Sequence, residues 1–405
     1  MILNFSLVNE LFRGFHILRW NDRVRPMDMI EIDKHAHKMV IAYCLGKYEE
    51  MNGNKVDWDK IIKGGIYELL RRIVISDIKS PIYTEIMKNK QVFSKLNEFV
   101  YKSLEPKIEN EELKSELKTF LIEDHEEDLN IRILDAAHIY ASLWEFRIIK
   151  QANPIDYQND RIYTSLIKRV NKYEGLSGIK KMQDQEKIVN FIDMVGQLRF
   201  QFRWAQIPRV PKTSVLGHTM LVACISYFFA RENGACPQRL FNNFFGGLFH
   251  DLPEAVTRDI ISPVKRSSSE LDKLIKDLEE SLSEQEIYPY IEPEWKNELN
   301  YFTKDEFVNK IFHNGHIFKQ MKGRDITVDD INAKYNTDEY SAFDGELIKA
   351  ADHLAAFLEA WNSCNSGIKT EELSRAAHDI KSKYRNQVIG KVQIKSLYSY
   401  FTHPC

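Results

Sequence analysis

The chain has 405 residues, of which 43% are hydrophobic and 28% are charged, and its formal net charge is −3. This length allows two or three domains that each bury a core. So small a net charge gives no whole-molecule field that would favour nucleic acid or a membrane surface. No run of about 18 apolar residues occurs, and basic residues come early in the N-terminal stretch, so we expect neither a membrane span nor a signal peptide.

The cysteines are few, odd in number and scattered, and no two of them have CxxC spacing. This usage favours reduced thiols in a cytoplasmic protein over a disulfide framework or a zinc ribbon. The five positions are Cys44, Cys224, Cys236, Cys364 and Cys405.

Apolar residues recur at steps of three and four along most of the chain, and strand-like alternation is scarce, so we predict an all-α fold. A first domain, 1–180, is expected to contain helices over 4–18, 34–51, 58–75, 82–102, 111–123 and 130–151. A polar, partly helical stretch from 153 to 185 is the candidate connection. A second domain, 185–405, is expected to contain helices over 185–202, 213–233, 237–250, 267–284 and 345–364, with an irregular insertion around 288–340.

The two regions contain an internal repeat, which predicts two copies of one helical unit. Its central block aligns without gaps and keeps two glycines, an Asp-Ile pair and a Ser-Pro pair in both copies. A block upstream runs the same distance from a histidine to a glycine in each copy, and a third block lies downstream. The paired blocks are Gly64–Ile82 with Gly246–Val264, His37–Gly53 with His218–Gly234, and Ala136–Glu145 with Ala350–Ala360.

The second copy contains a candidate metal site. His218 begins one predicted helix, the pair His250-Asp251 ends another, and Asp352 lies on a third among apolar neighbours. A buried carboxylate is costly unless it is paired or bound to metal, so Asp352 needs a partner. Two imidazoles and two carboxylates suit one borderline divalent ion. The alternatives are a core or capping role for His218 and an ion pair of Asp352 with Lys349 or an arginine.

These residues carry a family resemblance. The order H…HD…D resembles the signature of the HD-domain phosphohydrolase superfamily. The string HDLPEAVTRDIISPVK, from His250 to Lys265, is similar to a stretch of the YfbR-like 5′-deoxynucleotidases. The pair Arg203-Trp204 precedes His218 by the interval found in that family. The resemblance covers roughly residues 190–365, and the family's glycine after the threonine is replaced by Arg258.

The resemblance implies two tandem HD-type helical bundles and a metal-dependent nucleotide phosphohydrolase. Its substrate would be a 5′-(deoxy)nucleoside monophosphate, attacked by a metal-activated water. One divalent cation, whether Mn, Co, Mg, Ni, Zn or Fe, would be held by His218, His250, Asp251 and Asp352.

Further residues receive roles from the same resemblance. Arg203 and Lys265 would bind the substrate, with Arg203 on the phosphate. Trp204 would pack either against the sugar or in the core. Glu254 and Asp259 would orient the water or protonate the leaving oxygen.

Other functions remain open at this point. Within the HD class they are a dNTP triphosphohydrolase, a nucleotide pyrophosphatase or a phosphodiesterase. Outside it, the second copy could be a nucleotide-sensing module without turnover. The insertion of about thirty residues before Asp352 is either a lid that narrows the substrate range or extra packing.

The first copy has lost most of the candidate ligands and is expected to be catalytically inactive. At the aligned positions it carries His37, Glu68, Leu69 and His138, and Arg72 replaces the counterpart of Glu254. A rearranged site that uses His35 and Asp135 is one alternative. The retained Arg19-Trp20 pair reflects either inherited packing, in an intrachain pseudo-dimer or a homodimer, or a regulatory nucleotide pocket with Arg19 and Arg72 on the phosphates.

Overall fold

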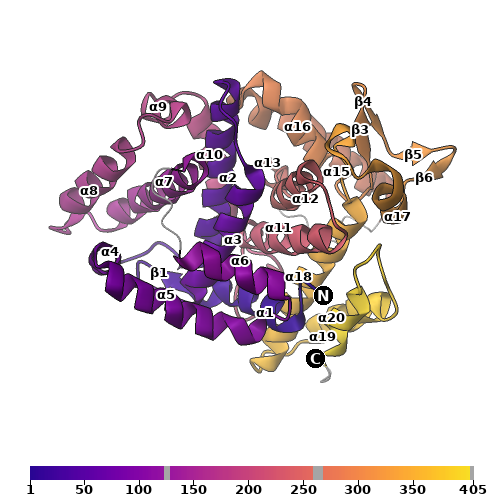
Figure 1. Cartoon of the computed structure of the whole chain (residues 1–405), viewed down its shortest axis with the longest axis horizontal. Coiled ribbons are helices and arrows are strands. Elements are labelled where there is room, and N and C mark those ends of the chain that lie inside the picture. Colours follow the sequence, from indigo (N-terminus) through magenta and orange to yellow (C-terminus); the bar gives the residue numbers. More distant parts are fainter. Residues whose placement is uncertain (123–127, 259–267, 402–405) are drawn as a thin grey trace. The chain divides into compact units, whose positions relative to one another are not determined.

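The computed structural model describes residues 1–122, 128–258 and 268–401 (Figure 1). The chain forms two compact units, here called unit 1 (Met1–Lys180) and unit 2 (Lys181–Cys405). Helices dominate both units, and the only sheets among the described residues are three two-stranded hairpins or ribbons. The prediction of an all-α fold is therefore confirmed. No helix in the described part of the chain is long and apolar enough to cross a bilayer.

Unit 1 is built around two long helices, α2 and α7, which pack against each other, while α3 packs against both. A two-residue ribbon pairs Leu18 with Ile30 and Arg19 with Met29. The elements are α1 (Phe5–Phe12), η1 (Arg13–His16), β1 (Leu18–Arg19), β2 (Met29–Ile30), α2 (Glu31–Met51), α3 (Trp58–Ile75), α4 (Ser80–Lys88), α5 (Lys90–Leu104), η2 (Glu105–Lys107), α6 (Glu111–Ile122), α7 (Leu129–Ala152), α8 (Asn159–Asn171) and α9 (Ser177–Gln183), the last of which crosses the boundary between the units.

Unit 2 repeats this pattern with α11, α12 and α18, where α11 packs against both of the others. Its helices outside the insertion are α10 (Ile188–Gln197), η3 (Leu198–Phe200), α11 (Val215–Glu232), α12 (Pro237–Phe249), α13 (Glu254–Thr257), α15 (Ser269–Leu282), α18 (Gly345–Asn365), α19 (Glu371–Tyr384) and α20 (Ile394–Ser399). The insertion holds η4 (Ser283–Ile287), η5 (Tyr288–Tyr290), α16 (Pro293–Thr303), β3 (Ile311–His313), β4 (His316–Phe318), β5 (Gln320–Met321), β6 (Arg324–Asp325), α17 (Val328–Asp330), η6 (Ile331–Tyr335) and η7 (Asp338–Tyr340).

The glycines of the repeat allow the central helices to approach closely. A Cβ on Gly247 of α12 would lie 2.9 Å from the Cα of Ala223 on α11, a contact with backbone that no rotamer change can relieve. Its counterpart Gly65, on α3, would meet the sulfur of Met39 on α2 at 2.3 Å. Gly247 therefore permits close backbone packing of α12 on α11, whereas Gly65 leaves room for the Met39 side chain between α3 and α2.

The stretch 153–185 is partly helical, as expected, and α8 packs against α7. Two expectations from the sequence are wrong in detail. The single helix predicted over 82–102 is two helices, because Asn89 is extended and its side chain accepts the amide N–H of Val92 at the start of α5. Cys44, Cys224 and Cys236 are free thiols, whereas Cys364 is disulfide-bonded, so reduced thiols are not found throughout.

Candidate metal centre

His218 lies in the first turn of α11, held there by a capped helix start. The hydroxyl of Ser214 accepts the amide N–H of Gly217 at 2.8 Å, which is the capping expected of a serine at this position. The His218 side chain is fully buried, and its two ring nitrogens face two carboxylates. Nε2 lies 3.0 Å from Oδ1 of Asp352, and Nδ1 lies 3.3 Å from Oε1 of Glu359.

His250 follows directly after α12 and is oriented by its own helix. Its Nδ1 lies 2.9 Å from the carbonyl oxygen of Gly247, so Nδ1 carries the proton that this bond requires. The other nitrogen, Nε2, is thereby presented to the interior of the site. It lies 3.2 Å from Oδ2 of Asp251.

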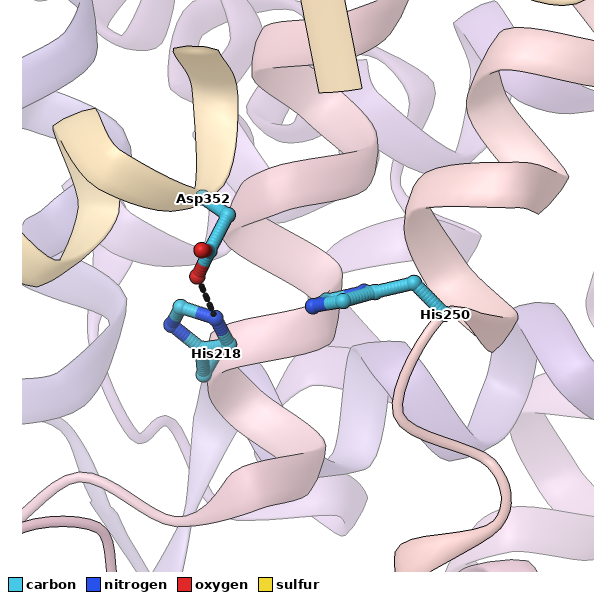
Figure 2. A group of neighbouring side chains, drawn as sticks. All are labelled: His218, His250 and Asp352. Atoms are coloured by element: carbon cyan, nitrogen blue, oxygen red, sulfur yellow. Dashed lines mark hydrogen bonds and ion pairs between the residues drawn. The ribbon is translucent and has the colours of Figure 1, made fainter. Parts of the chain in front are cut away.

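Three of the four predicted ligands converge on one point. Figure 2 shows His218 from α11, His250 from the end of α12 and Asp352 from α18 with their polar ends turned toward one another. One potential ligand atom from each lies within 4.8 Å of the others, the arrangement that a shared metal ion requires. Asp251 borders this trio through His250 and does not belong to the set that meets the 4.8 Å distance.

The charges of the site call for a cation. Burial raises the pKa of Asp352, but His218 and Arg203 outweigh burial and lower it to about 2. Burial lowers the pKa of His250, but Asp251 outweighs that effect and raises it to about 9. The contacts His218–Asp352 and His250–Asp251 each place a ring nitrogen beside a carboxylate oxygen, so each needs a proton or a shared cation between its atoms. The donor set therefore fits a divalent ion.

Glu359 is a functional residue that the ligand pattern did not reveal. It lies two turns after Asp352 on α18, is fully buried, and accepts hydrogen bonds from the Thr213 hydroxyl (2.9 Å) and the Trp204 indole N–H (2.7 Å). Its Oε1 lies 3.3 Å from Nδ1 of His218, the position from which a carboxylate orients the ring of a metal-binding histidine in known metal sites. The repeat held the signal, because Glu145 is the aligned and identical residue of the first copy.

Arg203 lies among the carboxylates of the site. Its Nε is 3.4 Å from Glu359, and its terminal nitrogens are 3.7 Å from Asp251 and 3.9 Å from Asp352. Glu359 thus contacts the Nε side of the guanidinium, and the terminal nitrogens of the guanidinium lie on the side of the candidate ligands. Trp204 is anchored by its bond to Glu359, which places it in the framework of the site.

The remaining predicted residues are less fully defined. Glu254 is buried and begins the short helix α13, four residues after His250. Asp259 and Lys265 lie outside the described residues. Arg258, which stands where the resemblance expects glycine, has φ +66°, a backbone conformation that disfavours any side chain.

Part of the insertion reaches the metal centre. The ring of Phe307 lies 6.1 Å from the ring of His250, measured between centroids. Burial raises the pKa of the neighbouring Glu306, and the charge of Asp251 adds to that effect. This segment is fixed against α18, because a Cβ on Gly345 would lie 2.3 Å from the amide nitrogen of Val308.

In unit 1 two lysines contact the side chains that are aligned with candidate metal ligands of unit 2. The ammonium of Lys34 on α2 lies 2.8 Å from Nε2 of His138, the counterpart of Asp352. Lys38, one turn later, pairs with Glu68, the counterpart of His250. No group of metal-binding side chains meets the 4.8 Å distance among the described residues of this unit. The rearranged site with His35 and Asp135 is therefore not formed.

Comparisons with known proteins give one family match in each unit. Residues 195–381 match the family model described as HD domain, and residues 7–175 match the one described as 5′-deoxynucleotidase YfbR-like. One match thus falls on each unit, and the two matches support an HD-domain phosphohydrolase with a tandem arrangement. The YfbR-like match falls on unit 1, although the motif resemblance was strongest in unit 2. No curated protein and no solved structure matches the chain significantly.

Proposed function

We propose that unit 2 hydrolyses 5′-(deoxy)nucleoside monophosphates to nucleoside and phosphate in the cytoplasm. The family matches support a metal-dependent nucleotide phosphohydrolase, and the observation that carries the proposal is the convergence of His218, His250 and Asp352. Asp251 would complete the ligand set, since its Oδ2 is buried, makes no hydrogen bond and borders His250.

A divalent ion held by these residues would lower the pKa of water and polarise a phosphoryl oxygen. The chain itself supplies the orientation. The Gly247 carbonyl accepts a hydrogen bond from Nδ1 of His250, which directs Nε2 of that ring at the ligand position. Glu359 lies 3.3 Å from Nδ1 of His218, on the side of the ring away from Asp352.

Arg203 would bind the phosphate of the substrate. Its Nε is directed at Glu359, and its terminal nitrogens lie 3.7 Å from Asp251 and 3.9 Å from Asp352. A phosphate bound beside the ligand set would therefore lie next to the guanidinium, whose paired N–H donors match two phosphate oxygens. Glu254, buried at the start of α13, is the candidate acid that protonates the leaving 5′-oxygen.

The decisive experiment measures products with defined metals. Purified protein is assayed with Mn²⁺, Co²⁺, Mg²⁺ and Ni²⁺ against nucleoside mono-, di- and triphosphates, with Asp251→Ala as the inactive control. We expect phosphate and nucleoside from monophosphates. Pyrophosphate or triphosphate as the product would replace the proposal with another HD activity, and full activity in Asp251→Ala would remove the metal assignment.

The insertion would restrict which substrates reach the metal. Phe307 is the residue of the insertion whose ring contacts a proposed ligand, and Gly345 holds its backbone in place. Phe307→Ala is therefore expected to flatten the preference among bases by raising kcat/KM for the poor substrates several-fold. The exposed insertion residue Phe318 provides the control, and an equal effect of Phe318→Ala would show that the contact with His250 is irrelevant.

A further inference from the structure

The site of unit 1 has the opposite charge to the site of unit 2. Unit 2 places three carboxylates at the candidate centre, whereas the aligned positions of unit 1 carry two lysines, one arginine, one histidine, which is counted as neutral, and one carboxylate. Without a metal, the first set has three negative formal charges and the second has two net positive ones. The aligned pairs, unit 2 first, are Asp251 and Leu69, Glu254 and Arg72, Asp352 and His138, His250 and Glu68, Val215 and Lys34, and Thr219 and Lys38.

Some of these positive charges are already neutralised. Lys38 pairs with Glu68. Arg19 is held by Glu31 at 2.6 Å and by Glu145 at 3.0 Å, so it is not free to bind a ligand. The role on a phosphate that the sequence suggested for Arg19 is therefore not supported.

Three basic residues in the same region have no carboxylate within 4.0 Å among the described residues. Lys34 is buried against His138. The guanidinium of Arg72 lies over the ring of Tyr83, 4.4 Å from its centroid. Arg169, on α8, donates from a terminal nitrogen to the Ser80 hydroxyl at 3.1 Å.

The electrostatics of these residues show that they influence one another. Burial lowers the pKa of Lys34 far below its usual range, and the charges of Arg19 and Arg72 lower it further. Burial likewise lowers the pKa of Arg169, with a smaller contribution from Arg72. The opposing carboxylates are Glu31 and Glu145, which raise the pKa of Lys34, the exposed Asp77, which interacts with Arg72, and Asp135, which interacts with Arg169. An anion placed among the cations would relieve their mutual repulsion.

We propose that unit 1 binds a phosphate group at this position and does not hydrolyse it. The guanidinium groups of Arg72 and Arg169 form the outer part of the site, and Lys34 with His138 forms its inner wall. A guanidinium offers paired N–H donors that match two oxygens of a phosphate, which makes phosphate the anion of choice here.

The lack of hydrolysis follows from the same residues. Leu69 cannot bind a metal, and Arg72 replaces the carboxylate that unit 2 offers as an acid. The ligand is either inorganic phosphate or a phosphate monoester such as a nucleotide. The proposal is independent of catalysis by unit 2.

Calorimetry on the full chain in the presence of EDTA tests the site, because chelation removes any metal-dependent binding in unit 2. Inorganic phosphate and a nucleoside 5′-monophosphate are titrated separately into the wild type, Arg72→Gln and Arg169→Gln. Arg161→Gln, an exposed arginine on the same helix as Arg169, is the matched control. Thermal unfolding verifies that each variant is folded.

We expect binding that weakens at least tenfold in Arg72→Gln and Arg169→Gln and is unchanged in Arg161→Gln, with the nucleotide recovered intact. Tighter binding of the monophosphate than of phosphate would assign the site to a nucleotide, and equal affinities would assign it to phosphate itself. Absence of binding of both ligands, or binding that persists in both site variants, would overturn the proposal.

Discussion

The two units share one arrangement, here called the clamp, in which a buried glutamate binds an adjacent arginine and tryptophan. They differ in the side chains that lie next to this clamp. In unit 2, Glu359 binds the side chains of Arg203 and Trp204, and in unit 1, Glu145 binds Arg19 and Trp20 through the same atoms. Both tryptophans have a φ of +57°. Since the unit without metal ligands keeps the whole arrangement, the clamp belongs to the architecture of the fold. The chemistry therefore depends on the residues that the clamp positions.

The largest expected effect comes from one substitution made at equivalent positions. His218→Gln removes a proposed ligand and should lower kcat/KM at least 1000-fold, because the metal-dependent part of the rate is lost. His37→Gln alters the aligned residue of unit 1, whose ring packs edge-on against Trp144, and should leave kcat/KM within twofold. Steady-state kinetics with saturating Mn²⁺ measures both. Equal losses in the two variants would show that the units do not differ in function.

The clamp gives the second matched pair. Glu359→Gln should reduce activity about 10- to 100-fold, as expected when the outer partner of a metal-binding histidine is altered. Glu145→Gln should leave activity intact and destabilise the chain by about 3 kcal/mol, because it weakens a buried ion pair with Arg19. Activity assays and urea unfolding separate the two outcomes. Loss of activity in Glu145→Gln would contradict the assignment of a purely architectural role to that clamp.

The sequence was sufficient for the helical class, the repeat and the ligand pattern, since each has a periodic or ordered signal. It could not place Lys34, because a lysine on a predicted helix is ordinarily solvent-exposed, and only the packing of α2 against α7 buries it. The role of Glu359 is hidden for a related reason: its partners come from distant segments of the chain, and one of them, Thr213, lies at the predicted start of a helix. The contact of Phe307 with His250 depends on how the insertion folds back, which no periodicity encodes.

The pH dependence of stability should also differ between the units. Burial raises the pKa of Asp135 from 3.8 to about 6, and Glu68 adds to the effect. Between pH 3.8 and pH 6, Asp135 is protonated in the folded chain and deprotonated in the unfolded chain. The free energy of unfolding therefore falls as pH rises through this range, by up to about 3 kcal/mol above pH 6. Asp135→Asn should therefore stabilise the chain at pH 8 and have less effect at pH 5. Thermal unfolding at both values tests this.

The aligned residue of unit 2 is the exposed Lys349, which serves as the control. Lys349→Gln should change the free energy of unfolding by no more than about 0.5 kcal/mol at either pH. A pH-independent effect of Asp135→Asn would mean that Asp135 is already charged at pH 5 in the folded chain, with its neighbours Lys38 and Arg169 stabilising the charge.

The smallest expected effect concerns a strain that both units share. Ser76 and Arg258 are aligned, follow α3 and α13 respectively, and have φ of +57° and +66°. A non-glycine residue in this backbone conformation costs about 1–3 kcal/mol of strain, which glycine would relieve. Part of that stabilisation is lost again, because glycine gives the unfolded chain more conformational entropy. Ser76→Gly and Arg258→Gly should each stabilise the chain by about 1 kcal/mol, whereas Ser94→Gly, in the interior of α5, should destabilise it. If Arg258→Gly stabilises but lowers kcat, the guanidinium serves catalysis in unit 2, and the strain persists there for function and in unit 1 by descent.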